Sequence, residues 1–289
     1  MIGVMQTDAI KTVAVLGAGT MGNGVAHVFA RAGYSVILRD VEQRFLDRGL
    51  EMISKNLDRE LKKQKITAAE KAATLARLKP TTDMSALAAA DFAVEAVPEQ
   101  LELKVRVLKE ADAILQPGVI LASNTSSISI TKLAAETTRA EKFIGMHFFN
   151  PVPVMALVEV IRGRATGDET FATTMALCEK LGKKPVGVND APGFVSNRVL
   201  MPMINEAAYA VMEGVATPEA VDAVMKLGMH HPMGPLELAD LIGLDVCVDI
   251  MEVLHRGFGN EKYAACPLLK EHVAAGRLGR KSGRGFYKY

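Results

Sequence analysis

The first half of the chain alternates short runs of apolar, often β-branched residues with stretches in which apolar residues recur at helical spacing. Such short runs are typical of strands. The predicted strands are Thr12–Leu16, Ser35–Leu38, Phe92–Val97, Val119–Ala122, Phe143–His147 and Leu157–Ile161. Strands that alternate with helices predict an α/β domain with a mainly parallel sheet and crossover helices.

From Asp190 onward the strand pattern stops, and alanine, methionine and leucine at helical spacing take over. Asp190 can cap a helix, and Pro192 can occupy its first turn. Helices are predicted over Asn197–Met212, Pro218–Leu227 and Leu241–Leu254. We therefore expect two domains, an α/β domain over residues 1–189 and an all-helical domain over residues 190–289.

The predicted helix Asn197–Met212 is apolar around almost its whole circumference. A helix of this kind must be buried. In a domain of roughly 100 residues, it can be buried between domains or against a second copy of the chain. We expect a homo-oligomer, with a homodimer as the expected state.

Composition and charge exclude several classes of protein. Hydrophobic residues make up 49% and charged residues 23% of the 289 residues, which is ordinary globular usage. The net charge of +1 gives no reason to expect nucleic acid or an anionic membrane as a partner. The three cysteines form no CxxC pair, so we expect free thiols and no metal site.

Because no apolar run approaches the roughly 18 residues of a membrane span and no signal peptide is apparent, we expect a cytoplasmic protein. A matrix protein with its presequence removed would look the same.

A glycine pattern follows the first predicted strand directly and opens a helix. In Gly17-x-Gly19-x-x-Gly22, the first glycine permits a tight turn, the second lets the backbone approach a pyrophosphate, and the third allows close packing of helix on strand. Asp40 ends the next strand, about 20 residues further on, where a carboxylate can bind the adenosine ribose. The pattern predicts a Rossmann-type domain and favours NAD over NADP. Two alternatives are a glycine-rich turn without a ligand and a 2′-phosphate paired with Arg39.

A histidine and a glutamate stand out in the strands Phe143–His147 and Leu157–Ile161. His147 ends its strand, where ligands of open α/β sheets gather, so it suits a general base. Glu159 lies inside an apolar run, where an unpaired carboxylate is costly. If the strands fold back on each other around residues 151–153, Glu159 faces His147 and can orient the imidazole. Alternatively, His147 is a core histidine, or Glu159 pairs with an arginine or lysine.

Three other polar features are weaker signals. The hydroxyls of residues 123–127 follow a strand and can bind a substrate oxygen, although such clusters are usually turns and caps. Asn197, near the domain boundary, taken alone is an ordinary polar helix residue. Residues 55–65 carry five basic side chains, which form either a solvated helix face or an anchor for a phosphorylated substrate.

With these residues in place, the chain resembles the short-chain 3-hydroxyacyl-CoA dehydrogenases from about residue 11 to residue 289. Several long motifs carry the resemblance. They are Gly17-Ala18-Gly19-Thr20-Met21-Gly22-Asn23-Gly24, Glu95-Ala96-Val97-Pro98-Glu99, Ser123-Asn124-Thr125-Ser126-Ser127, His147-Phe148-Phe149-Asn150-Pro151-Val152-Pro153, Pro192-Gly193-Phe194-Val195-Ser196-Asn197-Arg198 and Gly283-Arg284-Gly285-Phe286-Tyr287-Lys288-Tyr289.

The resemblance implies oxidation of an (S)-3-hydroxyacyl-CoA by NAD, and the reverse reduction. It implies that His147 is the catalytic base, that Glu159 orients it, and that Ser126 and Asn197 bind the reacting oxygen. The implied NAD contacts are Gly17, Gly19, Thr20, Met21, Gly22, Asp40, Glu99, Lys104, Ser126 and Asn150. The best matches to the CoA contacts are Asn56 and Lys63, although some relatives carry serine in place of Asn56.

Two other functions remain possible. A β-hydroxyacid dehydrogenase acting on a free acid shares only the glycine-rich start, and that group uses a catalytic lysine on a helix. A catalytically silent NAD-binding homologue should have lost a reacting residue. Here His147 and Glu159 are both present, so an acyl-CoA dehydrogenase is favoured.

Overall fold

The computed structural model describes residues 7–289, and the chain divides into two compact units. The first unit ends at Asp190, and the second spans Ala191–Tyr289. The expected fold class, a Rossmann-type α/β domain followed by an all-helical domain, is confirmed.

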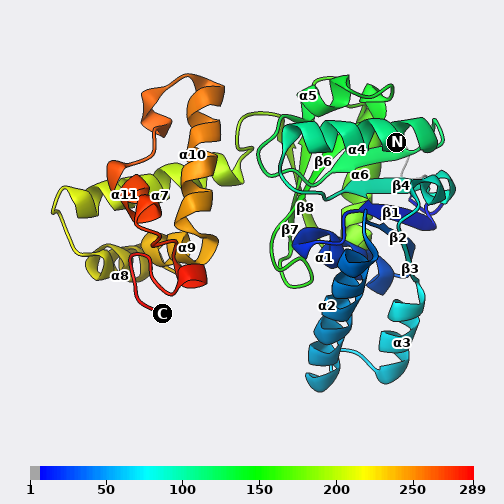
Figure 1. Ribbon diagram of the computed structural model, residues 1–289, viewed down its shortest axis with the longest axis horizontal. Helices are drawn as coiled ribbons and strands as arrows, with labels where there is room; N and C mark the ends of the chain where they lie inside the picture. Colours follow the sequence, from blue (N-terminus) through cyan, green and yellow to red (C-terminus); the bar gives the residue numbers. More distant parts are fainter. Residues whose placement is uncertain (1–6) are drawn as a thin grey trace. The chain divides into compact units, whose positions relative to one another are not determined.

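One eight-stranded sheet forms the centre of the first unit (Figure 1). The strand order is β3-β2-β1-β4-β5-β6-β7-β8, and among the strands of residues 7–289 β6–β7 is the only antiparallel pair. The strands are β1 (Thr12–Leu16), β2 (Ser35–Arg39), β3 (Leu78–Thr81), β4 (Phe92–Glu95), β5 (Ile120–Ser123), β6 (Phe143–Phe148), β7 (Leu157–Arg162) and β8 (Lys184–Asn189). The two edge strands, β3 and β8, are not among those predicted from the sequence.

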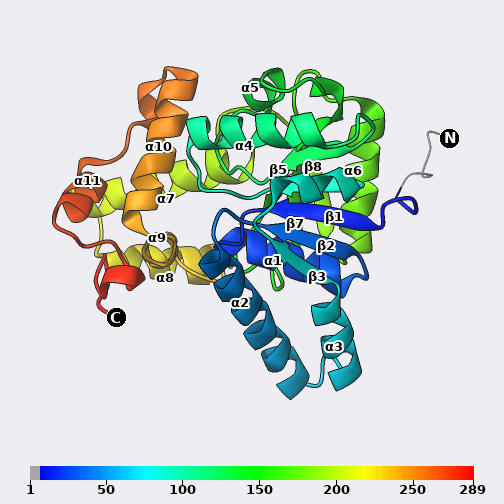
Figure 2. The same ribbon diagram turned by 45° about the vertical axis from the view of Figure 1, so that its right-hand side comes forward.

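Helices cover both faces of this sheet (Figures 1 and 2). The α-helices described in the first unit are α1 (Thr20–Arg31), α2 (Gln43–Lys62), α3 (Ala68–Ala76), α4 (Leu101–Ile114), α5 (Ile130–Ala135) and α6 (Asp168–Lys180). Two short 3-10 helices cover Met84–Ala89 and Ala140–Lys142. On one face, Phe29 of α1, Leu57 of α2 and Leu177 of α6 share a buried core with alternate residues of the strands, such as Val15 and Val94. Because side chains alternate across a strand, the residues between these point to the face that α4 and α5 cover.

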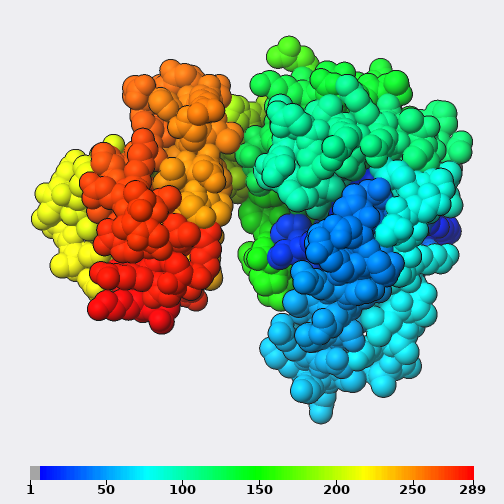
Figure 3. Space-filling view, viewed as in Figure 1, coloured from blue at the N-terminus to red at the C-terminus, as the bar shows by residue number. Residues whose placement is uncertain are grey.

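The helices α2 and α3 stand out from the rest of the first unit as a hairpin (Figures 2 and 3). Only one side of α2 is buried, at Leu46, Gly49, Ile53 and Leu57. A capping box of Thr67 and Glu70 begins α3. The basic stretch over residues 55–65 therefore covers the C-terminal half of a helix with a large solvated surface and the turn that follows it.

The second unit is entirely helical. Its helices are α7 (Ser196–Met212), α8 (Pro218–Met229), α9 (Pro235–Ile242), α10 (Leu244–Phe258) and α11 (Pro267–Ala274), with 3-10 turns at Glu261–Tyr263 and Arg280–Ser282. The helix expected over Leu241–Leu254 is interrupted, because Gly243 has a φ of 108° between α9 and α10. Few residues besides glycine adopt this backbone conformation.

Two expectations about the domain boundary are wrong. Asp190 does not cap the following helix: its carboxylate accepts hydrogen bonds from the Ser129 hydroxyl and the backbone N–H groups of Ile130 and Thr131, at the start of α5. The next helix, α7, begins without a side-chain cap. Nor does Pro192 occupy the first turn of this helix, which begins at Ser196. Val199 of α7 is 66% exposed within the single chain, so the expected burial of this helix against a second copy stays a prediction.

The core of the second unit lies on one side of α7 and continues into the C-terminal residues. Met201 and Ile204 pack in one cluster with Leu236, Cys247 and other apolar side chains. The buried Asp240 accepts hydrogen bonds from the backbone N–H groups of Phe286 and Tyr287, which fixes the final segment against α9. Within residues 7–289, no helix is long and apolar enough to span a membrane.

Candidate active site

The glycine pattern forms a turn between β1 and α1 that leaves room for a ligand. Gly17 has a φ of 104°, and a Cβ there would lie 2.7 Å from the Ala96 carbonyl oxygen. A Cβ on Gly22 would lie 1.8 Å from the carbonyl oxygen of Gly17. A Cβ on Gly19, in contrast, would meet nothing within 4 Å. Gly17 and Gly22 are therefore required by the fold, whereas Gly19 keeps open a space beside the N-terminus of α1.

This turn has the features that bind a pyrophosphate. The helix α1 begins at Thr20, and no side chain caps its N-terminus. Its first N–H groups and the positive end of its dipole favour an anion. Gly19 and Thr20 are exposed, and Met21 is half-buried. The residues present thus fit the diphosphate of a dinucleotide.

Asp40 lies beside the turn, directly after β2. One of its carboxylate oxygens accepts a hydrogen bond of 2.6 Å from the Ala18 N–H, and the other accepts one of 2.7 Å from the Val41 N–H. These bonds hold a negative charge where the ribose of a bound dinucleotide is expected, and this charge would repel a 2′-phosphate.

His147 and Glu159 are direct partners across the antiparallel strands β6 and β7. The imidazole Nδ1 lies 2.8 Å from Oε2 of Glu159, and the residues are 7% and 3% exposed. When Glu159 is ionised it can only accept, so Nδ1 is then the donor, and Nε2 is the ring nitrogen left for exchange of a proton. The expected pairing of the two strands is thereby confirmed.

Glu99 holds the polar segment Thr125–Ser127 that follows β5. Its Oε1 accepts hydrogen bonds from the hydroxyls of all three residues and from the backbone N–H groups of Ser126 and Ser127. Desolvation opposes ionisation of Glu99, but Lys104 and the bonds from Thr125 and Ser126 hold its pKa below the ordinary value. The Asn124 side chain also accepts the Phe148 N–H, which joins this segment to the strand of His147.

A buried charge cluster lies behind this segment, and the sequence analysis assigned no role to one of its members, Glu95. The Lys104 ammonium lies 2.8 Å from Oε1 of Glu95, 3.2 Å from Oε2 of Glu99 and 3.1 Å from the Val97 carbonyl oxygen. Glu95 and Lys104 are 0% and 1% exposed. The sequence does carry a signal, because Glu95 lies inside the apolar run Phe92–Val97, just as Glu159 lies inside another.

The connection from β6 to β7 is anchored by a second residue that the sequence analysis did not single out. Lys183, which follows α6, donates to the carbonyl oxygens of Val152 and Met155 at 2.5 and 2.8 Å. Asn150 is exposed at the start of this connection. A buried lysine with two carbonyl partners thus holds the loop that leads from His147 to Glu159.

The remaining predicted residues lie on helices. Asn56 is half-buried on α2, where its side chain accepts a hydrogen bond from Arg59, and Lys63 is exposed at the C-terminus of the same helix. Being seven residues apart, they share one face of α2. Asn197 lies in the first turn of α7, in the second unit.

Comparison with known proteins assigns both units. Residues 12–191 match the model of the 3-hydroxyacyl-CoA dehydrogenase NAD binding domain, and residues 193–289 match that of the 3-hydroxyacyl-CoA dehydrogenase C-terminal domain. The chain belongs to the 3-hydroxyacyl-CoA dehydrogenase family. The first unit is accordingly its NAD-binding domain, and the chain is an enzyme of this family.

Several members of the 3-hydroxyacyl-CoA dehydrogenase family are similar to the chain over almost their whole length. It is 55% identical over 280 residues to the "Probable 3-hydroxybutyryl-CoA dehydrogenase" of Bacillus subtilis, covering 97% of this chain and 98% of that one. It is 53% identical over 280 residues to the 3-hydroxybutyryl-CoA dehydrogenase of Bradyrhizobium diazoefficiens, covering 97% and 96%. The crystal structure of (S)-3-hydroxybutyryl-CoA dehydrogenase PaaH1 from Ralstonia eutropha is 54% identical, with a TM-score of 0.95 over 97% of this chain and 99% of that chain.

Proposed function

We propose that the protein is an NAD-dependent 3-hydroxybutyryl-CoA dehydrogenase, which interconverts (S)-3-hydroxybutyryl-CoA and acetoacetyl-CoA. The relatives with this activity in their names support the substrate. The observation that carries the chemistry is the pair of His147 and Glu159, buried at the edge of the sheet where β1, β4 and β5 also end. Ligands of open α/β sheets bind outside this edge.

His147 acts as the general base in the direction of oxidation. Its Nε2 takes the proton of the C3 hydroxyl, and the ring becomes an imidazolium. Glu159, bonded to Nδ1, stabilises that positive charge and fixes the ring in one orientation. In the reverse direction, the imidazolium returns the proton to the oxygen. NAD, when bound, supplies the acceptor for the hydride that leaves C3.

Ser126 and Asn197 bind the reacting oxygen. A hydroxyl and an amide that donate to this oxygen stabilise the negative charge that develops on it. Ser126 is suited to this role because Glu99 fixes both its backbone and its hydroxyl.

The first unit would hold the cofactor. Gly17, Gly19, Thr20, Met21 and Gly22 would bind its pyrophosphate. Asp40 would bind the adenosine ribose, and Glu99, Ser126 and Asn150 would contact the nicotinamide half. Asn56 and Lys63, on one face of α2, bind the CoA portion, where the basic residues of that helix favour phosphate groups.

The second unit contributes the surface through which two copies associate as a homodimer. Several apolar side chains in and before α8 are exposed, among them Val215 (73%), Val224 (62%) and Leu227 (82%). Large exposed apolar patches mark interaction sites. Contact with a second copy would remove this apolar surface from water, which is favourable.

The test is an assay of NADH absorbance with purified protein. We expect loss of absorbance with acetoacetyl-CoA and NADH, a much slower loss with NADPH, and none with free acetoacetate. Turnover of free acetoacetate would instead support a dehydrogenase of free acids. NADH binding without turnover of acetoacetyl-CoA or of a longer 3-ketoacyl-CoA would support a silent homologue.

A further inference from the structure

We propose that Glu95 is a positioning residue for the reaction, acting through Lys104 and Glu99 on the Thr125–Ser127 segment. The proposal rests on the proposed function in one respect, namely that Ser126 binds the reacting oxygen. Glu95 is 0% exposed, so its side chain does not contact the substrate directly.

Glu95 ties together three elements that meet at the edge of the sheet. Its Oε1 accepts from Lys104 on α4 at 2.8 Å and from the Val97 N–H at 2.7 Å. Its Oε2 accepts from the Ser123 hydroxyl, at the end of β5, at 2.5 Å. Its backbone carbonyl accepts the Asn124 N–H. Ser126 follows Asn124 by two residues, so Glu95 holds the backbone directly before it.

Lys104 transmits the effect of Glu95 to Glu99. Its ammonium has three donors, and three acceptors surround it, namely the two carboxylates and the Val97 carbonyl. Because the group is 1% exposed, water cannot replace a lost partner. Without the charge of Glu95, the ammonium would move towards Glu99 and draw its carboxylate away from Ser126 and Ser127.

The first test is a double-mutant cycle on turnover of acetoacetyl-CoA, with Glu95→Gln, Ser126→Ala and both together. We expect Glu95→Gln to lower kcat about ten- to a hundred-fold, since a misplaced group near the reacting centre costs that much. In the Ser126→Ala background, Glu95→Gln should lower kcat less than about two-fold, because the effects of two residues that act through one group are not additive. Equal losses in both backgrounds would overturn the proposal.

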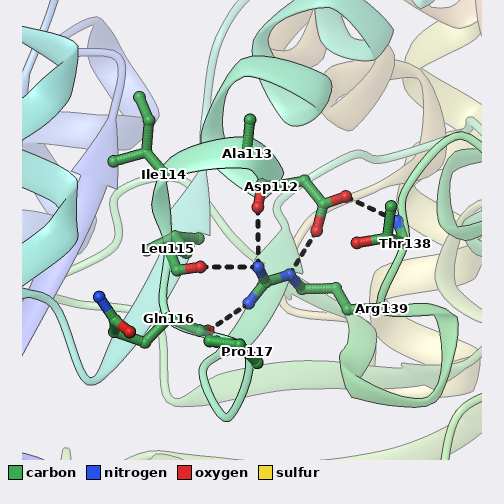
Figure 4. A pocket seen from close by; sticks show the side chains of 8 residues that line it. All are labelled: Asp112, Ala113, Ile114, Leu115, Gln116, Pro117, Thr138 and Arg139. Carbon is green, nitrogen blue, oxygen red and sulfur yellow. Dashed lines mark hydrogen bonds and ion pairs between the residues drawn. The ribbon is translucent and has the colours of Figure 1, made fainter.

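A matched control lies at the other end of α4. Asp112 and Arg139 form a second buried ion pair of 2.5 Å, and Arg139 also donates to backbone carbonyl oxygens around it (Figure 4). Asp112→Asn removes a buried charge on the same helix, as Glu95→Gln does on the neighbouring strand. We expect it to lower the melting temperature and to leave kcat within about two-fold of wild type. A loss of kcat equal to that of Glu95→Gln would show that the effect is one of stability alone.

The second test does not depend on activity. The Ser126 and Ser127 N–H groups donate to Glu99 at 2.8 and 3.0 Å, so their hydrogen exchange reports whether Glu99 is in place. We expect Glu95→Gln to accelerate exchange in residues 124–128 at least about ten-fold, and Asp112→Asn to leave this segment unchanged. Unaltered exchange in Glu95→Gln would overturn the proposal even in an active enzyme. Accelerated exchange in a protein whose wild type turns over no 3-ketoacyl-CoA would refute the proposed function and leave the positioning role supported.

Should Glu95→Gln fail to fold, Ser123→Ala is the milder variant. It deletes only the hydroxyl that donates to Oε2 of Glu95. We expect smaller changes in the same direction in both measurements. A Ser123→Ala enzyme with wild-type kcat and wild-type exchange of residues 124–128 would contradict the proposal.

Discussion

Glu159 faces His147 across an antiparallel strand pair, with 2.8 Å between Oε2 of the carboxylate and Nδ1 of the ring. Both side chains are almost fully buried, so the ring orientation is set by protein contacts and not by solvent.

His147→Gln and Glu159→Gln should each lower the turnover of acetoacetyl-CoA by about 10²- to 10⁴-fold, the usual contribution of a positioned acid or base. His147→Gln removes the group that takes the proton, and Glu159→Gln removes the charge that stabilises the imidazolium. NADH binding, followed by fluorescence titration, should stay close to wild type in both variants. Near-normal turnover in either one would show that the pair is not the catalytic dyad.

Two glycines of the same turn should respond in opposite ways to alanine. Gly22→Ala places a methyl group 1.8 Å from the Gly17 carbonyl oxygen and should destabilise the first unit severely. Gly19→Ala meets no atom within 4 Å, so the protein should keep its melting temperature but bind NADH at least about ten-fold more weakly. Thermal denaturation and NADH titration on both variants check this. Normal NADH affinity in Gly19→Ala would mean that the pyrophosphate does not approach this turn.

Asp40→Ala should weaken selection of NADH against NADPH. The substitution removes the carboxylate that would bind the ribose hydroxyls and repel a 2′-phosphate. We expect the ratio of kcat/KM for the two cofactors to fall by about ten-fold or more. An unchanged ratio would place the selectivity elsewhere, with Arg39 as the neighbouring residue to test next.

Acid should destabilise the protein through His27. Burial lowers the pKa of His27 below its ordinary value of 6.5, while Glu60, 3.5 Å away on α2, opposes this shift. The unfolded chain therefore takes up a proton near pH 6.5 that the folded chain refuses, so stability is complete above that pH and declines below it. The melting temperature should fall between about pH 7.5 and about pH 5, and less so in His27→Gln. A variant with the same fall as wild type would exclude His27 as the cause.

Leu227→Lys should separate the proposed dimer. Leu227 is 82% exposed on α8, where a charge disturbs nothing within the chain but opposes burial against a second copy. Sedimentation or light scattering should show a dimer for wild type and a monomer for the variant, with the melting temperature of the second unit little changed. A wild-type monomer would contradict the homodimer, and a dimeric variant would place the interface elsewhere.

The sequence predicts the central strands because these are buried and continuously apolar. The edge strands β3 and β8 are not predicted, since β3 contains Lys79 and Pro80, and β8 contains only exposed and partly exposed residues. Both pair with a neighbour, β2 and β7 respectively, and Leu78 of β3 is the one buried side chain of the two strands. Tertiary context decides such strands.

In the candidate site, too, contacts between residues close in sequence are predicted, and contacts between distant residues are not. His147 and Glu159 are 12 residues apart along the chain, so strand pattern and a short connection suffice to bring them together. Asp190 was assigned to the helix that follows it, whereas the fold uses it to begin α5, some 60 residues earlier. Lys183, too, contacts a loop about 30 residues away. Contacts of this range depend on the order of strands in the sheet, which the local pattern does not specify.

Arg139 has a consequence for the order in which the first unit is assembled. Its guanidinium binds the carbonyl oxygens of Asp112, Leu115, Gln116 and Val119, the groups that close α4 and lead into β5. A helix leaves its last carbonyl groups without partners of its own, and here a residue 20 to 27 positions later donates to them. The end of α4, the start of β5 and the segment before β6 should therefore form and unfold as one cooperative unit. During synthesis this unit cannot form until residue 139 has left the ribosome.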